Sequence, residues 1–446
     1  MEYAAKLERL RADLHARGAA ELGLHKHTSN LFRDRAARPD PKVDLSGFDR
    51  VVSVSPEESA VTCEAMATYA DIVDATLAKG TMPCVVPQLK SITIGGAAAG
   101  VGIEASSFRY GLVHESLLAI DVLLADGTVV TCAPENEHRD LFFGFPNSYG
   151  TLGYALKVTA RTIPVARHVR LQHIAHAESG AYFADLERQC RGDSDFIDGT
   201  VFAANQMYIT IGRFVDTAPY RSDYTFERIY YRSIRERDSD YLSARDYIWR
   251  WDTDWFWCSK NVHAQNPIVR RLLGRRRLNS VTYARVMRWN SRWGVTRLLS
   301  RMRGVHPESV IQDVDIPIAR APEFLAFLMR EIGILPVWVC PVRARDSTVQ
   351  FPLYRLEPDT LYVNFGFWDV IEDRQPRPQG FHNRAVERKV VELGGIKSLY
   401  SDVYFAEDEF WSIYNKPAYD ALKRRYDPQG VFRDLYSKCA RAPATA

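Results

Sequence analysis

A glycine-rich stretch at residues 91–111 has the composition of an anion-binding segment. Its five glycines are Gly95, Gly96, Gly100, Gly102 and Gly111. They leave the backbone bare, so a ligand can reach a run of main-chain N–H groups, which together form an anion nest. Nearby hydroxyls, which suit phosphate or ribose oxygens, belong to Thr93, Ser106 and Ser107. The spacing fits neither the G-x-G-x-x-G turn nor the P-loop. The stretch therefore predicts a different phosphate cradle, or else a glycine-rich turn packed against a sheet.

A second unusual segment, residues 247–258, concentrates large rings around charged groups. Its tryptophans are Trp249, Trp251, Trp255 and Trp257. Between them stand Arg250, Asp252 and Asp254. Aromatic clusters commonly belong to a core. A guanidinium among rings needs an anionic partner, so Arg250 faces either a ligand or one of the two aspartates.

The composition is that of a folded, water-soluble chain. The 446 residues allow roughly two or three domains, and 46% are hydrophobic and 25% charged. Seven scattered cysteines without a C-x-x-C pair indicate a reducing compartment and no metal site. Residues 3–14 have the spacing of an amphipathic helix and not of a signal peptide, and no apolar run approaches the ~20 residues needed to cross a bilayer. A cytoplasmic protein is expected.

Basic charge is confined to one stretch, residues 269–303, which contains eleven arginines and no acidic residue. Because the whole chain carries a net charge of +3, the rest of it is acidic overall. Leucine, methionine and tryptophan alternate with the arginines, a pattern typical of interfacial helices that bind anionic headgroups. No nucleic-acid motif accompanies the charge, so nucleic acid is not the expected partner. The alternative is a solvated basic surface.

Further motifs follow the glycine-rich stretch in a fixed order. They are Ser107-x-x-Tyr110-Gly111, the hairpin at residues 123–130 and the Ser-Tyr-Gly-Thr-Leu-Gly of residues 148–153. With Thr93-Ile94-Gly95-Gly96 they resemble the FAD-binding (PCMH-type) domain of vanillyl-alcohol-oxidase flavoproteins. Residues 86–96 and 100–112 are most similar to the Δ24-sterol reductase branch, and later segments up to residues 422–432 resemble it in the same order.

This resemblance implies an α+β fold and a set of cofactor contacts. The two-part FAD-binding domain would comprise residues 1–165 and a C-terminal return at 405–446, with an α+β substrate (cap) domain on an antiparallel sheet at 166–404. FAD would bind non-covalently, although His25 and His27 lie in the first loop. The implied contacts are Thr28, Ser29, Asn30, Thr93, Ile94, Gly95, Gly96, Gly100, Gly102, Ile103, Glu104, Ser106, Ser107, Tyr110, Gly111, Gly150, Thr151, Leu152 and Gly153.

The resemblance also implies the chemistry. It points to reduction of an isolated C=C bond of a lipid, with a hydride from flavin N5, a proton from a side chain, and NADPH as reductant. The implied catalytic residues are Arg250, Tyr400 and Tyr404. The implied substrate pocket comprises Trp249, Trp251, Phe256, Trp257 and Trp338. The substrate would be a sterol side chain or a methylene-branched fatty acyl chain of a phospholipid.

Two other functions fit the same scaffold. One is an oxidase or dehydrogenase that oxidises a hydrophobic alcohol with O2 or a quinone, and the other is a membrane-binding flavoprotein with a partner enzyme. A homo-oligomer is left open. Peripheral attachment to the inner face of the membrane is expected if residues 269–303 bind lipid.

Local patterns predict the elements that must position these residues. A strand at 50–56 should lead into a helix from Pro56 to about Ala78. A hairpin should turn at Asp126-Gly127, and a strand should cover 154–164. Strands are expected at 310–318, 335–341 and 361–366, with a helix at 322–332 between the first two.

Overall fold

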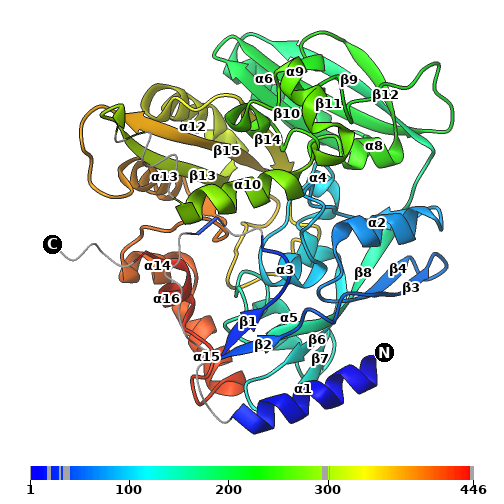
Figure 1. Cartoon of the computed structure of the whole chain (residues 1–446), viewed down its shortest axis with the longest axis vertical. Coiled ribbons are helices and arrows are strands. Elements are labelled where there is room, and N and C mark those ends of the chain that lie inside the picture. The colour runs from blue at the N-terminus through cyan, green and yellow to red at the C-terminus, as the bar shows by residue number, and fades with distance from the viewer. Residues whose placement is uncertain are drawn as a thin grey trace.

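The protein consists of two parts, each built around an antiparallel sheet, stacked as in Figure 1. The computed structural model describes residues 2–17, 22–29, 32–33, 41–293, 300 and 302–441. The N-terminal part occupies the lower half of the view, and the chain crosses into the upper part after residue 164. The predicted α+β class with an antiparallel sheet in the second part is confirmed.

The N-terminal sheet has the strand order β3-β4-β8-β6-β7, with β5 paired to β8. Its strands are β3 (Val51–Ser55), β4 (Ala60–Glu64), β5 (Thr81–Pro83), β6 (Leu117–Leu123), β7 (Val129–Cys132) and β8 (Tyr154–Pro164). The accompanying helices are α2 (Tyr69–Leu77), α3 (Ile94–Ala99), α4 (Ser107–Tyr110), η1 (Val113–Ser116) and α5 (Arg139–Gly144). Helix α1 (Tyr3–Arg17) precedes a separate parallel pair, β1 (Gly23–His25) and β2 (Lys42–Asp44). The predicted hairpin and the strand at 154–164 are confirmed.

The segment after β3 corrects one prediction, because no helix begins at Pro56. Ser59 turns the chain with a φ of 50°, and β4 then pairs with both β3 and β8. The β-branched and alternating residues of β4 outweigh the helix-start signal of the proline and the acidic residues before them. Helix α2 begins instead after Thr68, whose hydroxyl accepts a hydrogen bond from Asp71 N at 3.3 Å.

The second part contains a sheet of order β12-β9-β11-β10-β14-β15-β13-β16 in which all neighbours are antiparallel. Its strands are β9 (His168–His176), β10 (Phe196–Ala203), β11 (Gln206–Val215), β12 (Ser239–Ser243), β13 (His306–Pro317), β14 (Val337–Val342), β15 (Tyr362–Asp373) and β16 (Ile396–Lys397). The three strands and the helix predicted here are confirmed, with the helix divided into α12 (Ala321–Phe327) and η5 (Leu328–Ile332).

The two faces of this sheet bury different cores because side chains alternate along each strand. On β14, Val337 and Val339 pack with α6 (Ser179–Gln189), α12 and α13 (Phe381–Glu392) in one core. The alternate residues Trp338 and Cys340 belong to the other core. That core extends without a break from the N-terminal sheet through the tryptophan segment to the C-terminal helices.

Several short elements complete the second part. They are α7 (Tyr230–Ser233), α8 (Ala244–Ile248), η2 (Cys258–Val262), α9 (Pro267–Leu273), η3 (Arg275–Arg277), α10 (Ser280–Trp293) and η4 (Ile318–Arg320). Helix α10 lies across the boundary between the two parts in Figure 1. Within the described residues, no helix has both the length and the apolar character needed to cross a bilayer.

The C-terminal segment returns to the N-terminal part. Its helices are α14 (Glu407–Ile413), α15 (Lys416–Tyr426) and α16 (Leu435–Cys439). Lys423 Nζ donates to Thr151 O at 3.0 Å, and Tyr426 OH donates to Asp140 Oδ1 at 2.6 Å. Leu22 N also donates to Val431 O at 3.1 Å. The described C-terminal helices therefore pack on the part where the chain began.

Candidate active site

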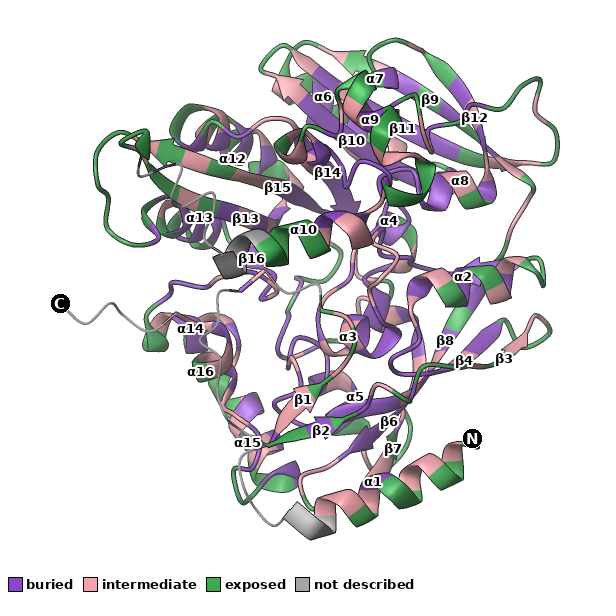
Figure 2. Ribbon diagram, viewed as in Figure 1, coloured by how far each residue is buried: buried purple, intermediate pink, exposed green. Residues whose placement is uncertain are grey.

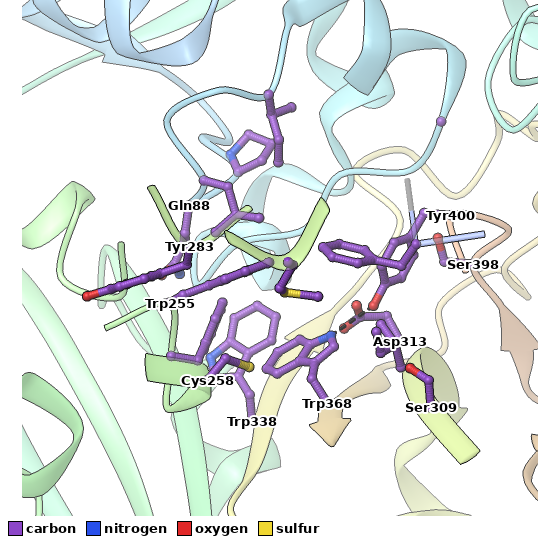
Figure 3. A pocket seen from close by; sticks show the side chains of 18 of the residues that line it. Gln88, Trp255, Cys258, Tyr283, Ser309, Asp313, Trp338, Trp368, Ser398 and Tyr400 are labelled. Atoms are coloured by element: carbon purple, nitrogen blue, oxygen red, sulfur yellow. Dashed lines mark hydrogen bonds between the residues drawn. The ribbon is translucent and has the colours of Figure 1, made fainter. Parts of the chain in front are cut away.

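A cavity of about 700 Å³ lies between the two parts. We call it the substrate cavity. The N-terminal part contributes the glycine-rich segment and Tyr149, and the second part contributes aromatic and aliphatic side chains from the tryptophan segment, α10 and strands β13 to β15. Figure 3 shows Trp255, Trp338 and Trp368 around this space, with Asp313 and Tyr400 at one end. The volume and the apolar lining are typical of a small-molecule site.

A second cavity of about 500 Å³ adjoins the first, since Lys26, Gly96 and Tyr149 line both. We call it the basic cavity. Besides Lys26, its lining includes the basic residues Lys42, Arg433 and Lys438. None of the described residues that line it is acidic. A long anionic ligand with an aromatic end could extend from the basic cavity into the substrate cavity.

About half of the predicted cofactor contacts line these two cavities. They are Ser29, Thr93, Gly95, Gly96, Gly100, Gly102, Ile103, Gly150 and Gly153. Gly96 lies where the cavities meet, and a Cβ built on it would have only Thr93 Oγ1 (2.9 Å) and Lys26 Nζ (3.7 Å) as near neighbours. The position is therefore bare on its cavity side, as a cradle for a close ligand requires. FAD, with its diphosphate and flavin ring, fits this pair of cavities.

The other predicted contacts line neither cavity. Ile94 and Leu152 are fully buried, and the hydroxyls of Ser106 and Thr151 donate to Cys84 O (2.7 Å) and Ser148 O (2.8 Å). The rest of this group are Thr28, Glu104, Ser107, Tyr110 and Gly111. Asn30 lies outside the described residues. Ser106, Ser107 and Thr151 therefore support the cradle from behind, because their hydroxyls hold neighbouring backbone and do not face the cavities.

Gln88 is a lining residue to which sequence reasoning gave no role. Its side chain is 4% exposed, and among the described residues neither its amide oxygen nor its amide nitrogen has a hydrogen-bond partner. It lines the substrate cavity beside the glycine-rich segment. A buried amide without partners is costly, so Gln88 is suited to bind polar atoms of a ligand in this cavity.

The aromatic wall includes only part of the predicted substrate pocket. Phe256 and Trp338 line the cavity, as do Trp255 and Trp368. Trp249, Trp251 and Trp257 do not; Trp251 stacks behind Phe256 with ring centroids 4.8 Å apart. Trp255 and Phe256 have φ angles of 43° and 59°, which are strained for bulky residues. This turn aims both rings into the cavity, and the buried tryptophans hold it in place.

An acidic group that sequence reasoning missed lies at the end of the cavity. Trp368 Nε1 donates to Tyr400 OH at 2.8 Å, and Tyr400 donates to the carboxyl group of Asp313. Burial raises the pKa of Asp313 to about 8, against the hydrogen bonds from Tyr400 and Trp368, which lower it. Asp313 therefore holds a proton at neutral pH. The signal in the sequence was the pair Asp313 and Asp315 at alternate positions of a strand, which places both on one face.

Gly366 makes room for this group. It is the register partner of Asp313 in the β13–β15 pair. A Cβ at Gly366 would lie 2.6 Å from Trp368 Cη2 and 2.8 Å from Asp313 Oδ1. Only glycine lets Trp368 lie over the strand beside the carboxyl group.

Arg250 does not line either cavity. Its Nη2 donates to Glu104 Oε1 at 2.9 Å and to Asp198 Oδ2 at 2.8 Å, and its side chain is fully buried. Asp252 and Asp254, the partners considered from the sequence, bind Lys90 and Arg270 instead. Asp198 also accepts a hydrogen bond from Trp338 Nε1 at 3.2 Å. Arg250 thus joins the glycine-rich segment to β10 and the aromatic wall.

Replacing Arg250 with methionine is expected to destabilise the protein by about 3–5 kcal/mol, because two buried carboxyl groups would lose their cation. The measurement is the free energy of unfolding in urea. The matched control is Arg245→Met, whose exposed pair with Asp74 should contribute about 0–1 kcal/mol. Equal effects of the two changes would contradict a structural role for the Arg250 pairs.

Tyr404 also lies away from the cavity. Its ring packs against the position of Gly380 and beside the guanidinium groups of Arg384 and Arg441, at 5.3 and 5.7 Å. Of the three residues predicted to be catalytic, the structure therefore brings only Tyr400 to the cavity. Residues 269–303 are described except for 294–299 and 301, and α10 within this stretch lines the cavity.

Comparison with known proteins agrees with this geometry. A family model for an FAD binding domain matches residues 27–133. Human Delta(24)-sterol reductase is 26% identical over 420 aligned residues, which cover 88% of this chain and 76% of the relative. The Pisum sativum Delta(24)-sterol reductase is 24% identical and covers 91% of this chain and 77% of the relative. Cytokinin dehydrogenase 7 of Oryza sativa is 28% identical over 138 residues, 30% of this chain and 26% of the relative.

The chain contains an FAD-binding domain of the PCMH type and is an FAD-dependent oxidoreductase. The recognition made from its motifs is confirmed, because the similarity to Delta(24)-sterol reductases extends over most of its length and that to the cytokinin dehydrogenase over less than a third. The match to an FAD binding domain confirms FAD as the cofactor. The individual contacts, the domain boundaries at 165 and 404, and the catalytic residues stay predictions.

Proposed function

We propose that the protein reduces an isolated C=C bond in the apolar chain of a lipid. The observation that supports this most directly is the carboxyl group of Asp313, with a pKa raised by burial, in a cavity with aromatic walls next to a basic, glycine-lined cavity that fits FAD. The Delta(24)-sterol reductases, whose name states a reduction of a sterol, are similar along most of the chain. When bound, the flavin supplies the hydride, and NADPH is the proposed source of electrons.

The side chains of the cavity supply what an unactivated double bond needs. The Asp313 carboxyl group holds a proton where the alkene would lie, and Tyr400 orients that carboxyl. Because such an alkene is a poor electrophile, early protonation creates carbocation character, which faces of Phe256, Trp338 and Trp368 can stabilise. The same rings exclude water. The reacting part of the substrate is thus a sterol side chain or a methylene-branched acyl chain of a phospholipid.

The protonation state of Asp313 also favours reduction over the alternative oxidation of an alcohol. Oxidation needs a base that accepts the hydroxyl proton, whereas a carboxyl group with a pKa of about 8 carries its proton at neutral pH. The oxidase or dehydrogenase function would therefore require Asp313 in its less populated state.

The test uses purified holoprotein and the lipids of its host. Under anaerobic conditions NADPH should bleach the flavin, and addition of host lipid extract should restore the colour. Mass spectrometry of the extract should show a gain of two hydrogens in one lipid class. Steady peroxide production with an alcohol, and no change in any lipid, would contradict the proposal and favour the oxidase.

Replacing Tyr400 with phenylalanine is expected to lower turnover about tenfold, since a general acid loses its orienting group. It should also move the alkaline limb of the pH–rate profile to higher pH, because the Tyr400 hydrogen bond lowers the pKa of Asp313 and its loss raises that pKa above about 8. Tyr404→Phe is the control, because Tyr404 is outside the cavity and should leave the limb unchanged. An unshifted limb in the Tyr400 variant would argue against the proposed proton donor.

A further inference from the structure

We propose that the mouth of the substrate cavity docks on an anionic bilayer, so that a lipid chain passes from the bilayer into the cavity over helix α10. This inference rests on the proposed function, because it names where the substrate of that same site comes from. Its starting point is that α10 contributes both to the lining of the cavity and to the outer surface of the protein.

The residues of α10 that line the cavity mark its opening. Tyr283 is buried, but Val286, Met287 and Trp289 are 41%, 39% and 57% exposed. Val370 of β15 lines the same cavity and is 43% exposed. Figure 2 shows exposed residues along α10 where it crosses the boundary between the two parts. A cavity rim built of exposed apolar side chains is typical of a site that meets an apolar surface.

Arginines stand on the other side of the same helix. With a helical rotation of about 100° per residue, Tyr283, Val286 and Met287 share one face, and Arg285 and Arg288 fall on the opposite one. Trp289 falls between Val286 and Arg285, so exposed apolar and basic side chains meet along that edge of the helix. Both arginines are exposed, and neither has an acidic partner among the described residues. Apolar side chains beside unpaired cations match the boundary between acyl chains and anionic headgroups.

The size of the cavity supports entry from a bilayer. Its volume of about 700 Å³ must hold the ring system of the cofactor and the reacting end of the substrate. The remainder of a phospholipid or sterol would then stay at the opening, against α10. An anionic headgroup there would lie near Arg285 and Arg288, and the chain would not need to cross water.

Docking is tested by sedimentation of the holoprotein with vesicles made of equal parts phosphatidylglycerol and phosphatidylcholine. Replacing Arg285 and Arg288 together with glutamine is expected to weaken binding about 30-fold, since each cation near such a surface contributes about 1 kcal/mol. The control pair is Arg330→Gln with Arg388→Gln, on η5 and α13, which pack on the opposite face of the sheet. The control should bind as the wild type does.

A second measurement locates the contact. Vesicles with brominated acyl chains should quench part of the tryptophan fluorescence, and Trp289→Phe should remove most of that quenching. If the glutamine pair binds as tightly as the control pair, or if Trp289→Phe leaves the quenching unchanged, the docking surface is not at α10.

The outcomes separate docking from catalysis. In detergent-dispersed host lipid, the glutamine pair should keep its FAD content and its turnover, and it should lose activity only on vesicles. If the wild type reduces lipid in detergent but binds no vesicle, the inference is overturned and the proposed function stays intact. Vesicle binding at α10 without reduction of any lipid would refute the proposed function, and docking would stand.

Discussion

Asparagine at position 313 is expected to lower the rate of lipid reduction by about two to four orders of magnitude, the range that a positioned general acid contributes. FAD content should be unchanged, because Asp313 lies on β13 and lines only the substrate cavity, not the basic cavity. In the wild type the rate should fall as pH rises through about 8, where Asp313 loses its proton. The variant should lack this limb. Retention of both rate and limb would contradict the assignment.

The Asp313→Asn change should lower the rate of lipid reduction but raise the stability of the protein relative to the wild type as pH rises. The pKa of Asp313 is about 8 in the folded protein and 3.8 in its ordinary state, so the native state binds the extra proton between these values. The stabilisation is therefore complete below about pH 4 and is lost as pH rises through about 8. Asparagine cannot lose a proton, so the variant should gain melting temperature relative to the wild type as pH is raised from 5 to 8. A residue that costs stability at working pH and supports turnover is typical of an active site.

Asp315 offers a matched control. It lies two residues along the same strand, on the same face, and burial raises its pKa to about 6. Its carboxylate accepts hydrogen bonds from Tyr354 OH at 2.7 Å and Asn364 Nδ2 at 2.9 Å, and it does not line the cavity. Asp315→Asn should change stability but keep the rate per folded molecule at neutral pH, and it should move the alkaline limb to lower pH, because the charge of Asp315 helps to raise the pKa of Asp313. A loss as large as that at Asp313 would mean that both variants act through the fold.

Valine at Gly96 is expected to give folded, colourless protein. Its added atoms would project from the junction of the two cavities, where a Cβ meets only the ends of the Thr93 and Lys26 side chains. The lost volume is the one that a bound FAD must occupy, so the ratio of flavin to protein should fall close to zero. Circular dichroism of the apoprotein should stay near the wild-type spectrum, and its melting temperature should fall only slightly, because the Cβ would lie 2.9 Å from Thr93 Oγ1 and that side chain must shift.

Two other glycines sharpen this test. At Gly95 a Cβ would lie 2.6 Å from Ala65 Cβ and 2.8 Å from Ala65 O, so valine there disturbs the protein itself and cannot report on FAD alone. Gly47 is exposed with no atom within 4 Å of its Cβ position, and Gly47→Val should keep full colour. Wild-type flavin content in the Gly96 variant would place the cofactor elsewhere.

Most of the fold could be predicted because local pattern and motif order agree. The strand at 154–164 alternates and ends in a proline, and β8 has those bounds. The structure after Pro56 could not be predicted in this way. A turn with a positive φ at Ser59 and pairing with β8 make this region a strand, and β8 lies about 100 residues away in the sequence. Short-range signals carry no information on such a partner.

The site was less accessible to sequence reasoning for the same reason. The glycines indicate a backbone that a ligand can approach, and Gly96, Gly100 and Gly102 do line the cavities. Asp313 becomes recognisable only when β15 brings Trp368, and the segment after β16 brings Tyr400, to its carboxyl group. The partners of Arg250 could not be predicted either, since Glu104 and Asp198 come from segments 146 and 52 residues away in the sequence.

The core runs without a break from the N-terminal sheet to the tryptophan segment, so substitutions that change which substrates fit the cavity also change the stability of the fold. Phe256 forms the cavity wall, and the buried rings of Trp251 and Trp257 support it from within that core. Truncating such a ring to alanine typically costs about 3–5 kcal/mol, a large share of the stability of an ordinary domain. A lineage that comes to accept a bulkier lipid must therefore first acquire stabilising substitutions elsewhere, or refill the core behind the wall. Selection for new substrates in this protein would begin from stabilised variants.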